Sequence, residues 1–167
     1  MSKAIFLCGF MGAGKTSVGK ALAKKLNFEF LDTDKLIEKK YGPISKIFAE
    51  KGEKYFRQKE LELAKELVSK ENVVISSGGG FVLSGEVQEI LKNSFVIYLE
   101  VPFEKCYSRI CRSERPLVRN NSKEQLLQIY NKRTSIYNSV SSLKISNSAY
   151  LPNTVDEIFS KIQNILL

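Results

Sequence analysis

The segment from Gly9 to Thr16 has residue types and a spacing that suit phosphate binding. Gly9, Gly14, Lys15 and Thr16 match the pattern G-x-x-x-x-G-K-[ST] in full. An apolar stretch precedes this segment and an amphipathic stretch follows it, which is the strand-to-helix context of a P-loop. Backbone N–H groups of such a loop turn inward around an anion, and the helix start adds positive partial charge. The predicted nucleotide contacts are Gly12, Ala13, Gly14, Lys15, Thr16 and Ser17.

The side chains of this loop fit the same chemistry. Lys15 can place a cation against the β- and γ-phosphates, and the Thr16 hydroxyl can ligate the accompanying Mg²⁺. A glycine turn with a chance lysine is the alternative, and average residue frequencies make it rare, in roughly one chain of this size in a hundred. A P-loop alone does not separate a kinase from a GTPase, a motor or a switch. The GTPase reading would require an Asn-Lys-x-Asp motif, which this sequence does not contain.

Two acidic residues follow the second predicted strand. Asp32 and Asp34 alternate along an extended chain, so they point the same way. At the carboxyl end of a strand, one carboxylate can lie near Mg²⁺ while the other accepts a proton from an attacking hydroxyl. A helix N-cap is an equally good interpretation of Asp34, because aspartate favours that position.

A run of glycines follows the third predicted strand. Gly78, Gly79 and Gly80 would let the backbone approach a ligand closely, and a flexible turn is the common alternative. The chain contains no histidine, so a general base near neutral pH must be a carboxylate, lysine, tyrosine or cysteine. The three cysteines, Cys8, Cys106 and Cys111, have no zinc-site spacing, and we expect small buried side chains in a reducing compartment.

Composition limits the class of protein. A chain of 167 residues with 43% hydrophobic and 26% charged residues fits one globular domain. The formal charge of +8 suits an anionic partner, although most of the lysines are better explained as solvated residues on helix faces. No aromatic-and-basic pattern typical of nucleic-acid binding occurs. The chain has no apolar run long enough to span a bilayer and no secretory signal pattern. We therefore expect a cytosolic protein with neither a nucleic-acid nor a membrane partner.

The hydrophobic pattern alternates between short strands and longer helices. Strands are predicted at 4–8, 29–32, 73–76, 95–101 and 143–146. Helices are predicted at 15–26, 34–40, 45–69, 84–92, 103–112 and 123–138, with a last one from Thr154, which has capping-box spacing to Glu157, to the chain end. This alternation predicts an α/β fold with a parallel sheet and helices on both faces. The polar segment 113–122 lacks periodicity and is predicted to be a mobile loop.

Together these residues resemble the shikimate kinase family over nearly the whole chain. The matching motifs are Gly9-x-x-Gly-x-Gly-Lys-Thr-Ser-Val-Gly19, Leu31-Asp-Thr-Asp34, Ile47-Phe48, Gly52-Glu53-x-x-Phe56-Arg57, Gly78-Gly-Gly80, Arg115-Pro116-Leu117 and Arg133 with Tyr137. The resemblance implies a single-domain, three-layer P-loop kinase with a five-stranded parallel sheet. It also implies an acceptor-binding helical subdomain at about 33–61 and a mobile lid at about 112–123.

The resemblance further implies a reaction and a role for each motif residue. The reaction is transfer of the ATP γ-phosphoryl group to the 3-hydroxyl of shikimate, with Mg²⁺, in aromatic amino-acid biosynthesis. Asp34 would hold the acceptor hydroxyls and act as base, and Arg57 and Arg133 would clamp the carboxylate. Gly79, between the substrate-binding residues Gly78 and Gly80, would donate a backbone N–H to the acceptor. The implied nucleotide and metal residues are Lys15, Arg115 and Arg109 for ATP, and Thr16 and Asp32 for Mg²⁺.

Some alternatives remain open at this point. Arg109 would lie beside the adenine, although Arg112 is one turn away and could replace it. The family's adenine-contacting segment near the C-terminus has no clear counterpart in residues 146–153. A different sugar acid or polyol as acceptor, or a non-enzymatic nucleotide-binding module, are the rival hypotheses to a monomeric shikimate kinase.

Overall fold

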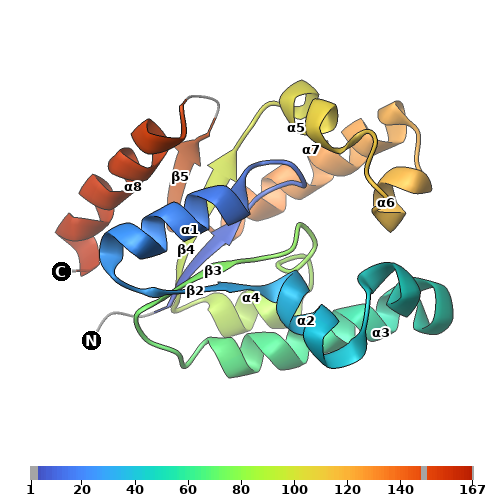
Figure 1. The fold of residues 1–167 in the computed structure, drawn as a ribbon, viewed down its shortest axis with the longest axis horizontal. Helices are drawn as coiled ribbons and strands as arrows, with labels where there is room; N and C mark the ends of the chain where they lie inside the picture. Colours follow the sequence, from blue (N-terminus) through green and yellow to red (C-terminus); the bar gives the residue numbers. More distant parts are fainter. Residues whose placement is uncertain (1–3, 148–149, 167) are drawn as a thin grey trace.

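A single parallel sheet forms the centre of the molecule. The computed structural model describes residues 4–147 and 150–166, and within them five strands follow the order β2-β3-β1-β4-β5 (Figure 1). The strands are β1 (Ile5–Cys8), β2 (Glu29–Asp32), β3 (Val73–Ser76), β4 (Phe95–Glu100) and β5 (Leu143–Ser146). All four neighbouring pairs are parallel. The predicted five-stranded parallel sheet is thereby confirmed.

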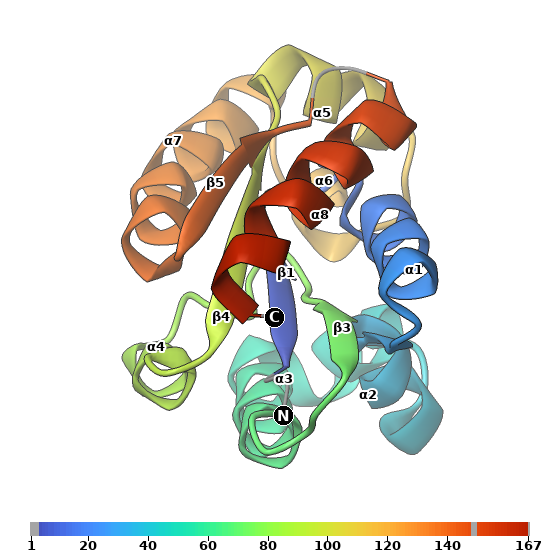
Figure 2. The same cartoon turned by 90° about the vertical axis from the view of Figure 1, so that its left-hand side faces the viewer.

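Helices connect the strands and cover the sheet. Among the described residues they are α1 (Lys15–Leu26), α2 (Thr33–Tyr41), α3 (Ile44–Leu67), α4 (Gly85–Leu91), α5 (Phe103–Ile110), α6 (Pro116–Arg119), α7 (Lys123–Val140) and α8 (Leu151–Leu166). In Figures 1 and 2, α1 and α8 lie on one side of the sheet, and α3, α4 and α7 lie on the other. The three-layer α/β architecture is as predicted.

The alternation of side chains along β1 divides the core into two layers. Ile5 and Leu7 pack in one buried cluster with residues of α1 and α8, whereas Phe6 and Cys8 pack in the other with residues of α3, α4, α5 and α7. Each layer is apolar because a parallel strand buried on both faces needs hydrophobic residues at every position. The central strands β1 and β3 are accordingly buried throughout.

The last helix begins earlier than predicted. Helix α8 starts at Leu151, so Thr154 lies inside its first turn and is not the N-cap. The spacing of Thr154 and Glu157 suggested that the helix begins at Thr154. Pro152 is favourable in a first helical turn, and this allows the helix to begin before Thr154. Thr154 is 2% exposed, and its backbone N–H donates to the Tyr150 carbonyl. Residue 167, to which the predicted helix extended, lies outside the described residues.

Two smaller predictions also differ from the structure. The segment 113–122 contains the short helix α6, which begins with Pro116 at its first position, so local hydrogen bonding forms a helix there without apolar periodicity. Cys111 is exposed at the end of α5, whereas Cys8 and Cys106 are buried as expected. Cys111 comes directly after the buried Ile110, and this places its side chain on the solvent side of the helix end.

No described helix combines the length and the apolar composition needed to cross a membrane.

Candidate active site

The carboxyl ends of three neighbouring strands form one side of a large cavity. Strand β1 leads into the P-loop, β2 into Asp32, and β3 into Gly78, and the sheet order places these ends next to one another. The cavity has a volume of about 830 Å³. Its lining includes Gly12, Gly14, Lys15, Thr16, Ser17, Asp32, Asp34, Arg57, Glu60, Gly78, Gly79, Gly80, Arg115 and Arg133. Of the predicted site residues, all except Ala13 and Arg109 line it.

The P-loop has the backbone conformation that its glycines permit. Gly12 and Gly14 have φ angles of 77° and 86°, a region that residues with a side chain rarely adopt. The ammonium group of Lys15 is buried and donates to the carbonyl oxygens of Gly9 at 2.7 Å and Phe10 at 2.8 Å. Burial lowers the pKa of Lys15 to about 8, although the nearby Asp34 carboxylate opposes this shift. The lysine is thus a buried cation at the base of the loop.

Two oxygen ligands suited to Mg²⁺ meet beside this lysine. The Thr16 hydroxyl donates to Asp32 Oδ2 at 3.1 Å and lies 3.5 Å from Ser76 Oγ. The other carboxylate oxygen of Asp32 accepts from the Lys35 backbone N–H, so Asp32 is the N-cap of α2. The N-cap interpretation of Asp34 is therefore wrong, because Asp32 caps the helix and Asp34 lies inside its first turn.

Asp34 lies in the first turn of α2 and faces the cavity. Burial raises the pKa of its carboxyl group, and the neighbouring Asp32 raises it further, while Lys15 and Arg115 act in the opposite direction. A carboxylate with a raised pKa is a stronger base than an ordinary aspartate. Asp34 therefore has the electrostatic environment of a proton acceptor.

The three glycines after β3 each adjoin a different charged side chain. A Cβ atom on Gly78 would lie 2.5 Å from Asp34 Oδ1, and one on Gly79 would lie 3.5 Å from Arg133 Nη1. A Cβ on Gly80 would overlap the guanidinium group of Arg57. None of the three glycines has a φ angle in the left-handed region. Close approach of charged groups is thus the reason for glycine at positions 78 and 80, whereas a Cβ on Gly79 would make only ordinary van der Waals contact.

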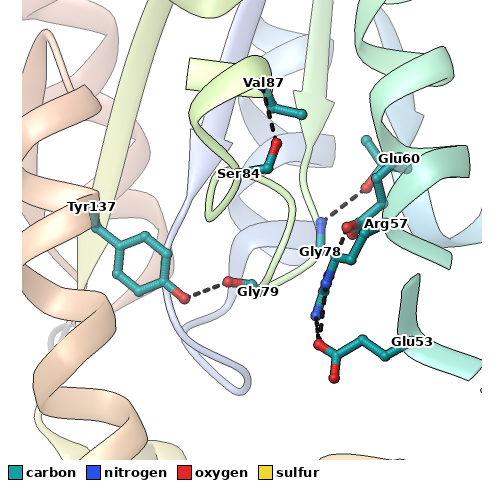
Figure 3. A network of polar contacts seen from close by, with 9 residues as sticks. Glu53, Arg57, Glu60, Gly78, Gly79, Ser84, Val87 and Tyr137 are labelled. Carbon is teal, nitrogen blue, oxygen red and sulfur yellow. Dashed lines mark hydrogen bonds and ion pairs between the residues drawn. The ribbon is translucent and has the colours of Figure 1, made fainter. Parts of the chain in front are cut away.

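Arg57 is held from two sides by carboxylates of its own helix. Its Nη1 donates to Glu60 Oε2 at 2.6 Å, and its Nη2 donates to Glu53 Oε1 at 3.1 Å (Figure 3). Glu60 is 2% exposed, and its Oε1 atom has no hydrogen-bond partner among the described residues. Burial raises the pKa of Glu60 to about 7, against the opposing effect of Arg57. The guanidinium group is therefore fixed in one orientation at the cavity wall.

Arg133 reaches the same glycine loop from α7. This helix begins with a capping box, in which the Ser122 side chain accepts from the Gln125 N–H and the Gln125 side chain accepts from the Ser122 N–H. Arg133 is 8% exposed, and Tyr137, one turn further on, donates its hydroxyl to the Gly79 carbonyl oxygen. Helices α3 and α7 thus bring two guanidinium groups to neighbouring glycines.

Arg109 lies outside the cavity. Its Nη1 donates to the Gly12 carbonyl at 2.7 Å, and Asn147 Nδ2 donates to the next carbonyl, that of Ala13, at 2.7 Å. Both side chains contact backbone carbonyls of the P-loop, and an adenine contact for Arg109 remains a prediction. Arg115 is exposed at the N-terminus of α6, and its charge is close enough to affect the pKa values of Lys15 and Asp34.

Sequence reasoning missed several residues of this site. Glu60 follows Arg57 by one helical turn, a spacing that favours ion pairs and could have identified it. Thr33, whose hydroxyl accepts from the Gly78 N–H at 2.9 Å, lies between the two aspartates and had no separate signal. Asn147 belongs to the segment 146–153, whose residues 148–149 lie outside the described part of the chain. Its contact with the P-loop depends on the fold and not on local sequence.

Comparison with known proteins identifies relatives over the whole chain. The family model described as shikimate kinase matches residues 11–166. The chain is 40% identical to the shikimate kinase of Clostridium botulinum over 169 residues, covering 100% of this chain and 99% of the relative. It is also 42% identical over 134 residues to a bifunctional shikimate kinase/3-dehydroquinate synthase of Thermotoga maritima, of which it covers 27%. The match to that larger relative covers 80% of this chain.

The fold is equally close to a solved structure. Shikimate kinase from Acinetobacter baumannii, in complex with shikimate, superposes with a TM-score of 0.93 at 37% identity, covering 100% of this chain and 97% of the other. Each matching motif contributes at least one residue to the lining of the cavity, including Phe48, whereas Ile47 packs in the buried core. The chain therefore belongs to the shikimate kinase family, the kinases that phosphorylate shikimate.

Proposed function

We propose that this kinase transfers the γ-phosphoryl group of ATP to the 3-hydroxyl of shikimate, with Asp34 as the general base. The observation that carries the proposal is the glycine loop, where Asp34, Arg133 and Arg57 adjoin Gly78, Gly79 and Gly80 in turn. A ligand on this loop would meet one carboxylate and two guanidinium groups. A hydroxy acid needs this combination, because its hydroxyl requires a base and its carboxylate requires cations.

The acceptor carboxylate is assigned to the two arginines. A guanidinium group binds a carboxylate through two parallel hydrogen bonds, and such charge-assisted pairs are stronger than neutral ones. Arg57 is pre-oriented by Glu53 and Glu60, so little side-chain entropy is lost when an acceptor binds. The glycine N–H groups supply further donors at the same wall.

The acceptor hydroxyl is assigned to Asp34. In-line attack on the γ-phosphoryl group requires the hydroxyl to be held in place and to lose its proton. Asp34 can accept that proton because burial raises the pKa of its carboxyl group. Lys15 and Arg115 neutralise charge on the phosphates, and this is where most of the rate enhancement in phosphoryl transfer arises.

Mg²⁺ and the phosphates are assigned to the loop around Lys15. The oxygen atoms of Thr16 and Asp32 are hard ligands of the type that Mg²⁺ accepts. Among the described residues no group of three or more acidic, histidine or cysteine side chains is placed to hold a metal ion, which suits a Mg²⁺ that binds together with nucleotide phosphates. When bound, Mg²⁺ neutralises charge on the β- and γ-phosphate oxygens.

The segment around α6 is proposed to close over the bound substrates. It lines the cavity opposite the glycine loop through Arg115, Leu117 and Asn121. Closure would exclude water, which could otherwise accept the phosphoryl group. Because one chain supplies every residue of the site, we propose that the enzyme acts as a monomer, in the cytosol where ATP is available.

Substitution of Arg57 tests the proposed acceptor. In Arg57→Met, the KM for shikimate should rise by about tenfold or more, because a charge-assisted hydrogen bond is lost, while the KM for ATP stays within about twofold. Lys59→Met is the matched control, since Lys59 lies on the same helix, forms an ion pair with the exposed Glu62 and does not line the cavity. An unchanged KM for shikimate in Arg57→Met would contradict the assignment and favour another polyol or sugar acid.

A further inference from the structure

Tyr137 contacts the acceptor wall without lining the cavity. Its hydroxyl donates to the Gly79 carbonyl oxygen at 2.5 Å, as Figure 3 shows. The side chain is 1% exposed, and its ring packs against Tyr98 of β4 with the centroids 5.4 Å apart. The hydroxyl is therefore held at the carbonyl by a fully packed ring that has no alternative position.

This hydrogen bond fixes one of the peptide planes in the glycine loop. In a trans peptide the C=O and the following N–H point in opposite directions, so the bond to the Gly79 carbonyl sets the direction of the Gly80 N–H. The preceding peptide plane, between Gly78 and Gly79, is fixed because the Gly78 carbonyl accepts a hydrogen bond from the Phe81 N–H at 3.0 Å. One plane earlier, the Gly78 N–H donates to the Thr33 hydroxyl at 2.9 Å.

The consequence is a pair of oriented donors. Within residues 4–147 and 150–166, the N–H groups of Gly79 and Gly80 have no hydrogen-bond partner, although both glycines line the cavity. Glycine has the widest choice of backbone conformations, so a three-glycine loop without anchors would lose more entropy when a ligand orders it. Tyr137 and Thr33 hold the two ends of the loop in advance.

We propose that Tyr137 is a positioning residue for acceptor binding, because its hydroxyl fixes the peptide plane that carries the Gly80 N–H, a donor that faces shikimate. The proposal rests on the proposed function, since it assumes that the acceptor binds at this loop. Arg133 lies one turn before Tyr137 on α7, with its Nη1 near Gly79. The same helix thus sets both the guanidinium group and the peptide plane on which the acceptor carboxylate depends.

The test is a steady-state comparison of Tyr137→Phe with the wild-type enzyme. Phenylalanine keeps the packed ring and removes only the hydroxyl. The KM for shikimate should rise by about three- to tenfold, the effect of one hydrogen bond, while the KM for ATP should stay within about twofold. Thr33→Val, which removes the anchor of the Gly78 N–H, should produce the same selective rise.

Tyr130→Phe is the matched control. Tyr130 lies on the same helix, and its hydroxyl also donates to a backbone carbonyl, that of Val101 at 2.7 Å, which follows β4 and does not belong to the glycine loop. Both KM values should remain within about twofold in this variant.

The other possible results refute either the positioning role of Tyr137 or the proposed function. If Tyr137→Phe leaves the KM for shikimate unchanged while the wild type turns over shikimate, the positioning role is refuted and the proposed function stands. If both KM values rise together with a lower Tm, the hydroxyl has only a general structural role and the proposal is refuted. A wild-type enzyme without shikimate-dependent turnover refutes the proposed function itself.

Discussion

At the scale of single residues, burial shifts the pKa values of three ionisable groups of the cavity, those of Lys15, Asp34 and Glu60. Glu60 has an ordinary pKa of 4.5, which is raised to about 7 in the folded protein. Between these two pH values the Glu60 carboxyl is protonated in the folded chain and mostly ionised in the unfolded chain. The stability that this group contributes is therefore greatest below pH 4.5 and is lost as the pH rises to about 7. A shift of this size corresponds to about 3 kcal/mol.

The Glu60→Gln variant should lack this pH dependence. Glutamine has a similar shape but no ionisable proton, so the unfolding free energy of the variant should fall less than that of the wild type between pH 4.5 and 7. Urea unfolding at several pH values measures the difference, with Glu62→Gln as an exposed control on the same helix. Parallel pH profiles for the wild type and Glu60→Gln would contradict the raised pKa.

Lys15 should make ATP binding depend on pH in the alkaline range. The pKa of its ammonium group is about 8, so the free enzyme loses this cation as the pH rises through that value. Phosphates bind the charged form, and the Kd for ATP should therefore increase above pH 8, by up to about tenfold per pH unit. Calorimetric titration from pH 7 to 9.5 measures the effect. Lys15→Met should bind ATP weakly with no such dependence, and a wild-type Kd that is constant over this range would contradict the lowered pKa.

Individual residues differ in how far the sequence predicted them. The P-loop residues were predictable because their chemistry depends on a contiguous stretch of chain. Asp34, Arg57 and Arg133 were predicted through the resemblance. The spacing alone fitted Asp34 equally well as a helix cap and as a general base. Glu60 was missed because its importance arises from burial beside Arg57, and burial depends on how α3 packs.

At the scale of elements, the turn after β3 requires glycine for space. A methyl group on Gly80 would overlap the Arg57 guanidinium and displace it from the cavity wall. We therefore expect Gly80→Ala to raise the KM for shikimate by about tenfold or more, with little change in the KM for ATP.

The control for this prediction is a glycine without neighbours. No described residue lies within 4 Å of a Cβ atom on Gly85, at the start of α4, so Gly85→Ala should leave both KM values unchanged. Alanine is also the better helix former, by up to about 1 kcal/mol. Equal kinetic effects in the two variants would show that the overlap at Gly80 has no role in acceptor binding.

Element positions followed from hydrophobic periodicity, and element ends depended on local capping. All five strands were predicted within one residue of the described bounds, because β-rich apolar runs alternate clearly with amphipathic stretches. The start of α8 and the presence of α6 were not predicted. In both places a proline occupies the beginning of a helix, and its preference for that position does not appear as periodicity.

At the scale of the whole molecule, the strand order determines what the site can do. The order β2-β3-β1 places the aspartates, the glycine loop and the P-loop at one edge of the sheet, and α3 and α7 add one arginine each from the same face. Residues separated by more than 100 positions in sequence thus form a single cavity for two substrates. This convergence could be expected from the fold class, but the pairing of each glycine with one charged group could be found only from coordinates.

The most direct test of this account is ADP release from Mg-ATP, measured with and without shikimate for the wild type and for Asp34→Asn. We expect turnover that depends on shikimate in the wild type and a loss of about 100-fold or more in kcat for Asp34→Asn, the typical effect of removing a general base. Binding of shikimate to the variant should persist, because both arginines remain. Wild-type ADP release that shikimate does not accelerate, or an Asp34→Asn enzyme as fast as the wild type, would contradict the account.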